Sequence, residues 1–207
     1  MDGKKPTAGI ILAAGMSTRL GKPKQLLDLR GKYLLEWILD ACLGSELDKT
    51  FLVLGHQHQK IFRTLDQKLR HPNIQVVVNT KYREGQSRSL RAGLLETGDV
   101  FPSVMFLLGD QPMVDSKMIN LLLFRFWNSE KDICLATHRG KRRNPVIFGR
   151  KWYDQLLEIK GDIGAREIIE ANTRNVLAVG VEDSRYFYDI DTERDYANLL
   201  NVIDACA

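Results

Sequence analysis

Continuous apolar runs alternate with amphipathic stretches over the first two thirds of the chain. The amphipathic stretches repeat their apolar residues at helical spacing, which predicts helices over 34–43, 61–69 and 116–127. A further helix is expected to be capped by Ser87 or Ser89 and to end near 95. The apolar runs are continuous rather than alternating, as in buried parallel strands, and they cover 8–13, 51–54, 74–78, 104–108 and 133–137. This order of elements predicts an α/β fold with three layers, α/β/α, around a mostly parallel sheet.

The pattern loosens after about residue 138. Arg139 to Arg143 is expected to form a basic loop, and extended segments are expected at 145–148, 176–181 and 187–190. Helical spacing recurs at 151–157 and 163–171, and a last helix is expected to begin at Asp191 or Thr192 and to end near Ile203. Because the chain contains no internal repeat, low-complexity segment or linker, one domain is expected for residues 1–207.

Composition and charge narrow the classes of function. The chain has 207 residues, of which 44% are hydrophobic and 27% charged, which is ordinary for a soluble globular protein with a substantial core. The net charge of +4 suits an anionic small molecule and does not require nucleic acid. Cys42, Cys134 and Cys206 are widely spaced, which favours a reducing compartment over a disulfide framework or a zinc site. The first apolar run is too short to span a bilayer, so we expect a cytoplasmic protein without a membrane partner.

The first predicted strand runs into a loop of small residues and then into cations. The stretch is Ile10-Ile11-Leu12-Ala13-Ala14-Gly15-Met16-Ser17-Thr18-Arg19-Leu20-Gly21-Lys22-Pro23-Lys24. Its small residues let the backbone approach a ligand closely, and Arg19, Lys22 and Lys24 then supply positive charge. A nucleotide is the simplest ligand for such a loop, and a tight turn followed by a solvated basic loop is the alternative. The stretch matches neither a P-loop, because Pro23 follows Gly21-Lys22, nor the three-glycine dinucleotide fingerprint.

Small or polar residues follow three of the predicted strands. Gly15, Asn79 and Asp110 would lie at the carboxyl ends of parallel strands, which is where such sheets bind ligands. Asp110 is a candidate ligand for Mg²⁺, a cation that keeps few protein ligands, or else it caps a turn. Asp189 and Asp191 alternate along a short extended piece, which puts both carboxylates on one face. One of them could join Asp110 on the metal, while Asp191 could instead cap the last helix.

Two further segments carry hydrogen-bonding groups where helices are expected to begin. In residues 79–89, Gly85 permits close approach, and the side chains that follow suit a base edge or a phosphate: Gln86, Ser87 and Ser89. Plain helix capping explains only one of these serines. In Gly161-Asp162-Ile163-Gly164-Ala165-Arg166, Asp162 is expected to cap the next helix, where free amides could also hold an anion. The four histidines show no metal-ligand spacing, and none is assigned to catalysis.

These motifs together resemble a known family. Leu12-Ala13-Ala14-Gly15-x3-Arg19-Leu20-Gly21-x2-Lys24 resembles the signature of nucleotidyltransferases with a glycosyltransferase-A-like, Rossmann-like fold. Among the MobA-like NTP transferases, the chain looks like the molybdenum-cofactor cytidylyltransferase (MocA-like) family. Later stretches support that branch: Gly85-x3-Ser89-Leu90, Gly109-Asp110-Gln111-Pro112, Asn144-Pro145-Val146-Ile147-Phe148, Gly161 to Arg166, and Asp189-Ile190-Asp191-Thr192. The resemblance covers about residues 8–200.

The resemblance implies transfer of CMP from CTP to the phosphate of molybdopterin cofactor, with release of pyrophosphate. The product, molybdopterin cytosine dinucleotide, would serve molybdenum hydroxylases, and an apo-hydroxylase is a further candidate partner. About 8–138 would form the nucleotide-binding half, and about 139–207 the half that binds the cofactor substrate and completes the sheet. Mg²⁺ would be held by Asp110 and Asp191, and the catalytic residues would be Arg19, Lys24 and Asp110. The nucleotide-binding residues implied are Leu12, Ala13, Ala14, Gly15, Arg19, Lys24, Gly85 and Ser89, with Arg19 and Lys24 on the phosphates and Ser89 near the cytosine.

Departures from the family pattern bear on the substrate. Ala14 stands where the sibling guanylyltransferases have Gly, and its methyl group leaves less room beside the base, which favours a pyrimidine. Arg143 stands where the family often has Gly, and Glu193 where Pro is usual. We expect one in-line displacement by a phosphate oxygen that is already anionic, so that no general base is needed. The alternatives are a GTP-dependent or sugar-phosphate nucleotidyltransferase and a non-catalytic carrier of the cofactor.

Overall fold

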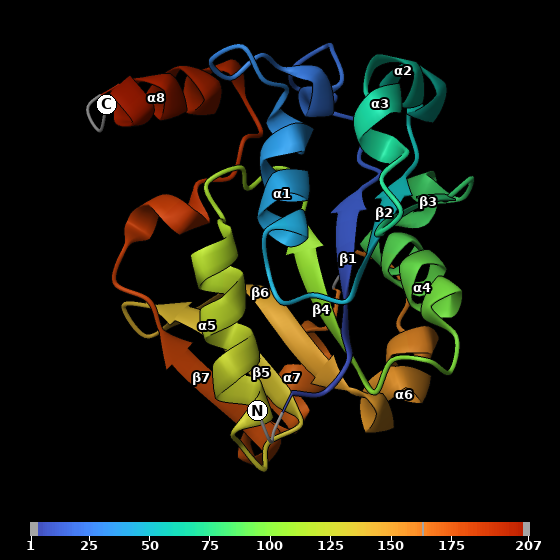
Figure 1. The fold of residues 1–207 in the computed structure, drawn as a ribbon, viewed down its shortest axis with the longest axis vertical. Helices are drawn as coiled ribbons and strands as arrows, with labels where there is room; N and C mark the ends of the chain where they lie inside the picture. The colour runs from blue at the N-terminus through green and yellow to red at the C-terminus, as the bar shows by residue number, and fades with distance from the viewer. Residues whose placement is uncertain (1–3, 163, 205–207) are drawn as a thin grey trace.

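The computed structural model describes residues 4–162 and 164–204 and contains a seven-stranded sheet in the order β3-β2-β1-β4-β6-β5-β7. The strands are β1 (Thr7–Ala13), β2 (Lys49–Leu54), β3 (Ile74–Val78), β4 (Ser103–Leu108), β5 (Ile133–His138), β6 (Lys141–Gly149) and β7 (Val176–Gly180). Neighbouring strands are parallel except where β6 pairs with β4 and β5, and both of those pairings are antiparallel. The predicted α/β fold with a mostly parallel sheet is confirmed (Figure 1).

Helices cover both faces of this sheet (Figure 1). One face carries α1 (Leu34–Leu43), α2 (His58–Thr64), α3 (Asp66–Leu69) and α5 (Ser116–Trp127). The other face carries α4 (Gln86–Thr97), α6 (Tyr153–Glu158) and α7 (Arg166–Ala171). The last helix, α8 (Glu193–Asp204), lies away from the sheet and packs against the segment between β1 and α1. Short 3-10 turns lie at Lys24–Leu26, Tyr82–Glu84, Arg150–Trp152, Thr173–Asn175 and Ser184–Phe187.

Each face of the sheet has its own hydrophobic core. Ile11 of β1 belongs to the core under α1 and α5, and the preceding Ile10 belongs to the core under α4. Consecutive strand residues point to opposite faces, so a strand covered on both sides has to be apolar throughout. A third cluster joins α8 to the rest of the molecule and includes Ile190 and Leu199. It holds residues 189–191 close to the end of β4.

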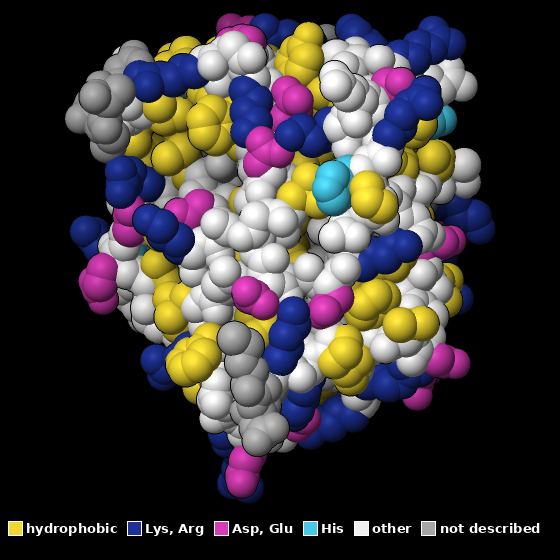
Figure 2. Space-filling model, viewed as in Figure 1, with side chains coloured by type: hydrophobic (Ala, Val, Ile, Leu, Met, Phe, Trp, Pro, Cys, Tyr) yellow, Lys and Arg dark blue, Asp and Glu magenta, His cyan; other side chains and the backbone are white. Residues whose placement is uncertain are grey.

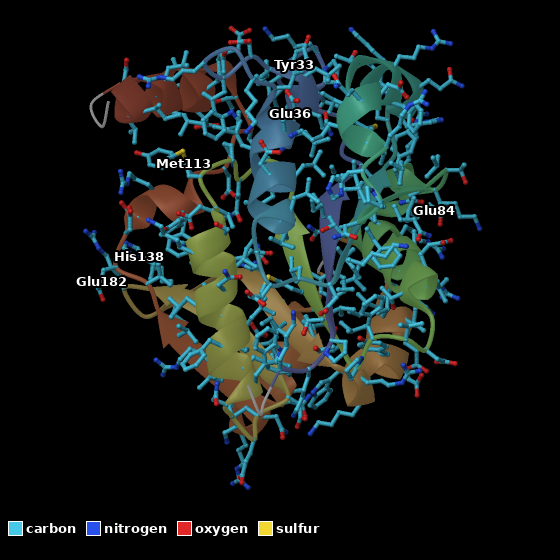
Figure 3. All side chains as sticks on the ribbon, viewed as in Figure 1. Tyr33, Glu36, Glu84, Met113, His138 and Glu182 are labelled. Atoms are coloured by element: carbon cyan, nitrogen blue, oxygen red, sulfur yellow. The ribbon has the colours of Figure 1, made fainter. Side chains whose placement is uncertain are left out.

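Side chains at the starts of α1 and α8 accept hydrogen bonds from the backbone N–H groups there. At α1 the Glu36 carboxylate accepts a hydrogen bond from the Tyr33 backbone N–H at 2.8 Å, and both residues lie at the top of the helix (Figure 3). At α8 the Asp195 carboxylate accepts from the Thr192 backbone N–H at 2.8 Å, while the Thr192 hydroxyl accepts from the Asp195 backbone N–H at 3.1 Å. Thr192 is therefore the capping residue. The Asp191 carboxylate is left available for other contacts.

Three predicted elements differ in part from those observed. The helix expected over 61–69 is two short helices, because the chain departs from helical geometry at Leu65, with φ −104° and ψ 16°. Of the extended piece expected over 187–190, Phe187 ends a 3-10 turn, whereas Tyr188 has extended dihedrals, with φ −75° and ψ 114°, and residues 188–190 join no sheet. The helix expected over 163–171 spans only Arg166–Ala171 among the described residues, and Ile163 lies outside them.

The basic loop expected at 139–143 and the serine cap expected on α4 are also wrong. Residues from Lys141 onward pair with β5, and only Arg139 and Gly140, both with positive φ, form the turn of this hairpin. Ser87 and Ser89 lie inside α4 and are buried. The residue that precedes that helix is Gly85, which has no side chain to cap with.

Acidic and basic side chains are interspersed over the face that carries α1 and α5 (Figure 2). Within residues 4–162 and 164–204, none of the helices combines the length and the apolar character needed to cross a bilayer.

Candidate functional site

A cleft of about 730 Å³ lies at the carboxyl ends of β1 and β4. Open α/β sheets bind their ligands at this edge, as the sequence predicted. The lining residues come from the segments 12–16, 24–25, 82–86 and 108–110 and from Ser89, Gly161, Asp162 and Asp191. Every residue that the sequence assigned to the nucleotide or the metal lines this cleft, except Arg19.

Three charged side chains meet at one end of the cleft, and we call Lys24, Asp110 and Asp191 the charged triad. Lys24 Nζ donates to Asp110 Oδ2 at 2.5 Å and to Asp191 Oδ1 at 2.9 Å. The side chains of Lys24 and Asp110 are only 14% and 18% exposed, whereas that of Asp191 is 51% exposed. The triad is therefore shielded from water on the side of Asp110 and open to it on the side of Asp191.

The triad is held in place by segments that are far apart in the sequence. Lys24 begins a 3-10 turn, and its backbone N–H donates to the Ser17 hydroxyl at 3.1 Å. Asp110 follows β4, and its backbone carbonyl accepts from the Ile190 N–H at 3.2 Å. Because Ile190 is fixed in the third core cluster, this hydrogen bond holds Asp191 beside Asp110.

The electrostatics of the triad make Lys24 a fixed cation. Burial alone would lower the pKa of Lys24, since desolvation disfavours an ammonium ion. The charges and hydrogen bonds of Asp110 and Asp191 outweigh that effect and hold the pKa of Lys24 above its usual 10.5. Lys24 therefore stays protonated at neutral pH and provides charge rather than proton transfer.

The triad also meets a basic requirement of a divalent-cation site. Oxygens of Asp110 and Asp191 already converge on one positive charge, at 2.5 and 2.9 Å from it. Mg²⁺ commonly binds one or two carboxylates and completes its shell with water and phosphate oxygens. Residues 4–162 and 164–204 contain no group of three or more acidic, histidine or cysteine side chains suited to a metal. A cation held by Asp110 and Asp191 would compete with Lys24 for the two carboxylates.

Asp189 lies outside the triad. Its carboxylate accepts from Gln111 Nε2 at 2.8 Å. Burial raises the pKa of Asp189, and the charges of Asp110 and Asp191 add to this, against the opposing effect of the Gln111 hydrogen bond. Of the two aspartates that the sequence placed on one face, Asp191 reaches the triad, while Asp189 ties the segment to the residue after Asp110.

Arg19 lies near the triad but outside the cleft lining. Its side chain is 71% exposed, and its Nη1 is 3.6 Å from Asp191 Oδ2. An ion pair so open to water is weak, and it leaves the guanidinium able to turn toward a phosphate at the cleft.

The loop after β1 offers backbone to the cleft. A Cβ added to Gly15 would meet no protein atom within 4 Å, whereas one added to Gly109 would lie 2.7 Å from the Cβ of Ala13. Gln25, which the sequence analysis missed, is 2% exposed, and its Nε2 donates to the Ala13 carbonyl at 2.7 Å. In the sequence, only its place directly after Lys24 pointed to a position near the site. Gln25 and Gly109 therefore fix Ala13 from two sides, while the space beside Gly15 stays open.

A neighbouring loop covers the N-terminus of α4. The Gln86 N–H donates to Asp162 Oδ1 at 2.9 Å, and the Ser87 N–H donates to the Gly161 carbonyl at 3.2 Å. A Cβ on Gly85, where φ is +105°, would lie 2.6 Å from the Gly161 oxygen. Asp162 therefore caps α4 instead of the helix that follows it, which corrects the prediction. The close approach that Gly85 permits is to Gly161, and the two amides are occupied within the chain.

A hydrogen bond joins Asn79 to Ser89, which lies in the first turn of α4 and lines the cleft. Asn79 follows β3, is 6% exposed, and donates from Nδ2 to Ser89 Oγ at 3.0 Å. Its Oδ1 accepts from the Lys81 backbone N–H at 2.9 Å. Ser89 lines the cleft, and Asn79 lies behind it. The sequence placed Asn79 directly after a strand, as the structure has it, but it did not show that Asn79 donates to Ser89.

A second cavity of about 200 Å³ adjoins the cleft and shares with it Leu12, Gln86 and Leu108. Apolar side chains of β4, β5 and β6 form much of its lining, and its other polar residues are Arg142, Arg143, Asn144 and Arg166. Arg142 forms an ion pair with Glu170, and Arg143 lies over the ring of Phe187 at 5.9 Å. The combination of apolar walls and positive charge suits an anionic molecule with a flat, weakly polar part.

Comparison with known proteins identifies related sequences. Residues 9–176 match the family described as MobA-like NTP transferase domain. Purine catabolism protein PucB of Bacillus subtilis (strain 168) is 26% identical over 194 residues, which cover 91% of this chain and 93% of PucB. Bifunctional protein GlmU of Sorangium cellulosum (strain So ce56) is 25% identical over 166 residues, which cover 78% of this chain but only 34% of GlmU.

Solved structures share the fold over nearly the whole chain. Rv0371c from Mycobacterium tuberculosis H37Rv superposes with a TM-score of 0.81 at 26% identity, covering 97% of this chain and 100% of Rv0371c. The Rv0371c complex with manganese superposes with a TM-score of 0.76 at 23% identity, covering 95% of this chain and 98% of that one. CMP:2-keto-3-deoxy-manno-octonic acid synthetase complexed with CTP gives 0.76 at 12% identity, with 98% and 100% covered. Molybdopterin-guanine dinucleotide biosynthesis protein A from Archaeoglobus fulgidus gives 0.69 at 18% identity, with 96% and 99% covered.

Proposed function

The chain belongs to the MobA-like NTP transferase family, and on that premise we propose that it transfers CMP from CTP to the phosphate of molybdopterin cofactor, releasing pyrophosphate. The observation that carries this proposal is the charged triad beside an open backbone loop. A fixed ammonium and two convergent carboxylates provide what a nucleoside triphosphate with its divalent cation needs. The product, molybdopterin cytosine dinucleotide, would serve molybdenum hydroxylases.

The proposed reaction is one in-line displacement. An oxygen of the cofactor's terminal phosphate attacks the α-phosphorus of CTP, and the bond from that phosphorus to the oxygen bridging to the β-phosphate breaks. Pyrophosphate leaves with the electron pair of that bond. The attacking oxygen is already anionic near neutral pH, so the site needs no general base. Lys24 and Arg19 would neutralise charge on the triphosphate, and positioning would supply the rest of the acceleration.

We propose Mg²⁺ as the cation that Asp110 and Asp191 would hold. Carboxylate oxygens are ligands that both Mg²⁺ and Mn²⁺ prefer. The manganese complex of Rv0371c supports a divalent cation in a protein of this fold. When bound, the cation would supply further neutralisation of the phosphate charge.

The nucleotide would lie along the backbone of Ala13 to Gly15, with its base toward Ser89. The preference for CTP is supported by Ala14, which lines the cleft and is only 5% exposed. Its methyl group takes up room that a glycine would leave free for a larger base. Proteins of this fold are named for both cytosine and guanine nucleotides, so the fold alone does not select the base.

The second cavity would receive part of the cofactor. Its apolar lining suits the flat pterin, and its arginines suit the anionic groups of that molecule. Because it adjoins the cleft, an acceptor there could present its phosphate to the α-phosphorus of a nucleotide in the cleft. The name of the Archaeoglobus protein, which concerns a molybdopterin dinucleotide, supports an acceptor of this class.

A sugar-phosphate acceptor is the second candidate. A non-catalytic carrier of the cofactor is disfavoured, because a carrier has no use for a triad of paired charges beside a nucleotide-sized cleft.

A nucleotide panel tests the proposal. The protein is incubated with Mg²⁺, molybdopterin cofactor and CTP, GTP, UTP or ATP in turn, and pyrophosphate is measured. We expect release with CTP that depends on the cofactor. Release with GTP alone, or release only after sugar phosphates replace the cofactor, would assign the chain to one of the alternatives. Cofactor binding without release from any nucleotide would support the carrier.

A further inference from the structure

The side-chain amide of Asn79 has only one orientation that satisfies its contacts. A backbone N–H, that of Lys81, points at one end of the amide at 2.9 Å, and a backbone N–H can only donate. The atom at that end is therefore the acceptor, Oδ1. The atom at the other end, 3.0 Å from Ser89 Oγ, is then Nδ2, which can only donate. Burial at 6% exposure keeps water from competing for either contact.

This orientation fixes the role of the Ser89 hydroxyl. Its oxygen accepts the hydrogen bond from Asn79, and its own proton remains for a different partner. Within residues 4–162 and 164–204, no acceptor is paired with that proton. Since Ser89 lines the cleft, the proton is available to a ligand there.

The spacing of the strands that precede Asn79 and Asp110 suits the length of a nucleotide. Asn79 follows β3 and Asp110 follows β4, and the sheet order puts these strands three spacings apart. Three spacings amount to about 14 Å, which is the scale of an extended nucleoside triphosphate. If the triad holds the phosphates, the base would lie toward Ser89.

We propose that Asn79 is a positioning residue that makes Ser89 a hydrogen-bond donor to the nucleotide base, so that this end of the cleft reads an acceptor atom. The inference rests on the proposed function, since it assumes that a nucleotide occupies the cleft. Cytosine presents two neighbouring acceptors, O2 and N3, and a fixed donor suits either. The Watson–Crick edge of guanine presents N–H donors at the corresponding ring positions, and a fixed donor would leave them unpaired.

Replacing Asn79 with aspartate separates this role from a purely structural one. A carboxylate in the same place can still accept from the Lys81 N–H, and it would also accept the proton of Ser89. Both contacts of the loop survive, but Ser89 then turns lone pairs toward the cleft. If Asn79 only ties the loop to α4, the Asn79→Asp variant should bind nucleotide as the native protein does.

Calorimetric titrations with CTP and Mg²⁺ compare the native protein, Asn79→Asp, Ser89→Ala and the double variant. Inorganic tripolyphosphate serves as a probe without a base. We expect each single variant to weaken CTP binding about tenfold, as loss of one hydrogen bond in a shielded site does, with tripolyphosphate binding unchanged. The double variant should be no weaker than Ser89→Ala alone. A variant that retains the hydroxyl, Ser89→Thr, should bind CTP within about threefold of native.

Three results would overturn the inference. Native-like CTP binding by Asn79→Asp would leave Asn79 a structural tie. If Asn79→Asp weakens the binding of CTP and of tripolyphosphate equally, the cause is the added negative charge. The same holds if Asn79→Asp still weakens CTP binding when Ser89 has been replaced by alanine. If Asn79→Asp fails to fold, judged by its thermal unfolding, Ser89→Ala against Ser89→Thr decides whether a donor is read. If native protein binds another nucleotide instead of CTP, the proposed function fails, and the same titrations with that nucleotide still test Asn79.

Discussion

The two ends of the cleft satisfy their polar groups in opposite ways. At the end where we propose that the phosphates bind (the phosphate end), the charged triad brings together side chains from three distant parts of the chain, and each charge is already paired with another. At the end where we propose that the base binds (the base end), Asn79 and Ser89 belong to one short segment, and their contacts leave a donor open. In the proposed binding mode, the ligand would therefore have to rearrange the phosphate end, whereas the base end would receive it without rearrangement.

The largest effect that this comparison predicts follows removal of a carboxylate from the triad. Asp110→Ala should lower CTP-dependent pyrophosphate release by at least about 100-fold, because the proposed cation loses its more buried ligand. Asp154→Ala, which removes an exposed carboxylate on α6, should leave the rate unchanged. Near-normal pyrophosphate release by Asp110→Ala would show that Asp110 does not hold the proposed cation.

A smaller effect, and one of opposite sign, should follow removal of the ammonium. In the absence of nucleotide, Lys24→Met should bind Mn²⁺ about tenfold more tightly than native protein, because nothing then competes for the two carboxylates. Electron paramagnetic resonance of free Mn²⁺ measures this directly. In the presence of CTP the same variant should bind the nucleotide more weakly, since Lys24 is no longer there to contact phosphate. Unchanged Mn²⁺ binding without nucleotide would mean that the phosphate end needs no rearrangement.

The open space beside Gly15 gives a prediction for the loop between the two ends. Gly15→Ala should weaken CTP binding by roughly tenfold or less, with no loss of thermal stability, because the added methyl meets only a ligand. Gly109→Ala is the matched control, since its methyl would press on Ala13 and destabilise the fold by about 1–3 kcal/mol. Calorimetric binding and thermal unfolding of both variants separate the two effects. Native affinity in Gly15→Ala would show that no ligand approaches this backbone.

The smallest expected effect is that of pH on the triad. Since the pKa of Lys24 is raised, its ion pairs contribute fully to stability below 10.5 and are lost only as the pH rises through the still higher value in the folded protein. The difference in unfolding free energy between native protein and Lys24→Met should be constant from about pH 7 to 9 and should shrink only once the pH has risen above 10.5. Chemical unfolding at these pH values measures it. A change between about pH 7 and 9 would contradict a fixed ammonium.

Much of the fold was open to prediction because apolar runs and helical spacing report burial directly. The bounds expected for α1, β3 and α5 match those observed. The break at Leu65 and the hairpin at Arg139 and Gly140 were not predicted. The first depends on local backbone geometry, and the second on pairing with β5, neither of which the apolar pattern records.

The sequence predicted which residues form the candidate site better than it predicted the contacts between them. Motifs named Lys24, Asp110 and Asp191, and the structure brings them together. That Lys24 lies between the carboxylates depends on a fold that joins residues more than eighty positions apart. The roles of Gln25 and Asp162 likewise depend on partners distant in sequence, Ala13 and Gln86.

The transfer of label from CTP tests the proposed reaction most directly. Protein, Mg²⁺ and molybdopterin cofactor are incubated with CTP labelled either at the α- or at the γ-phosphate, and the products are separated. The α label should appear in a molybdopterin dinucleotide and the γ label in pyrophosphate, in equal amounts. If the α label stays in CTP, or moves to a sugar phosphate and not to the cofactor, the proposed function is wrong.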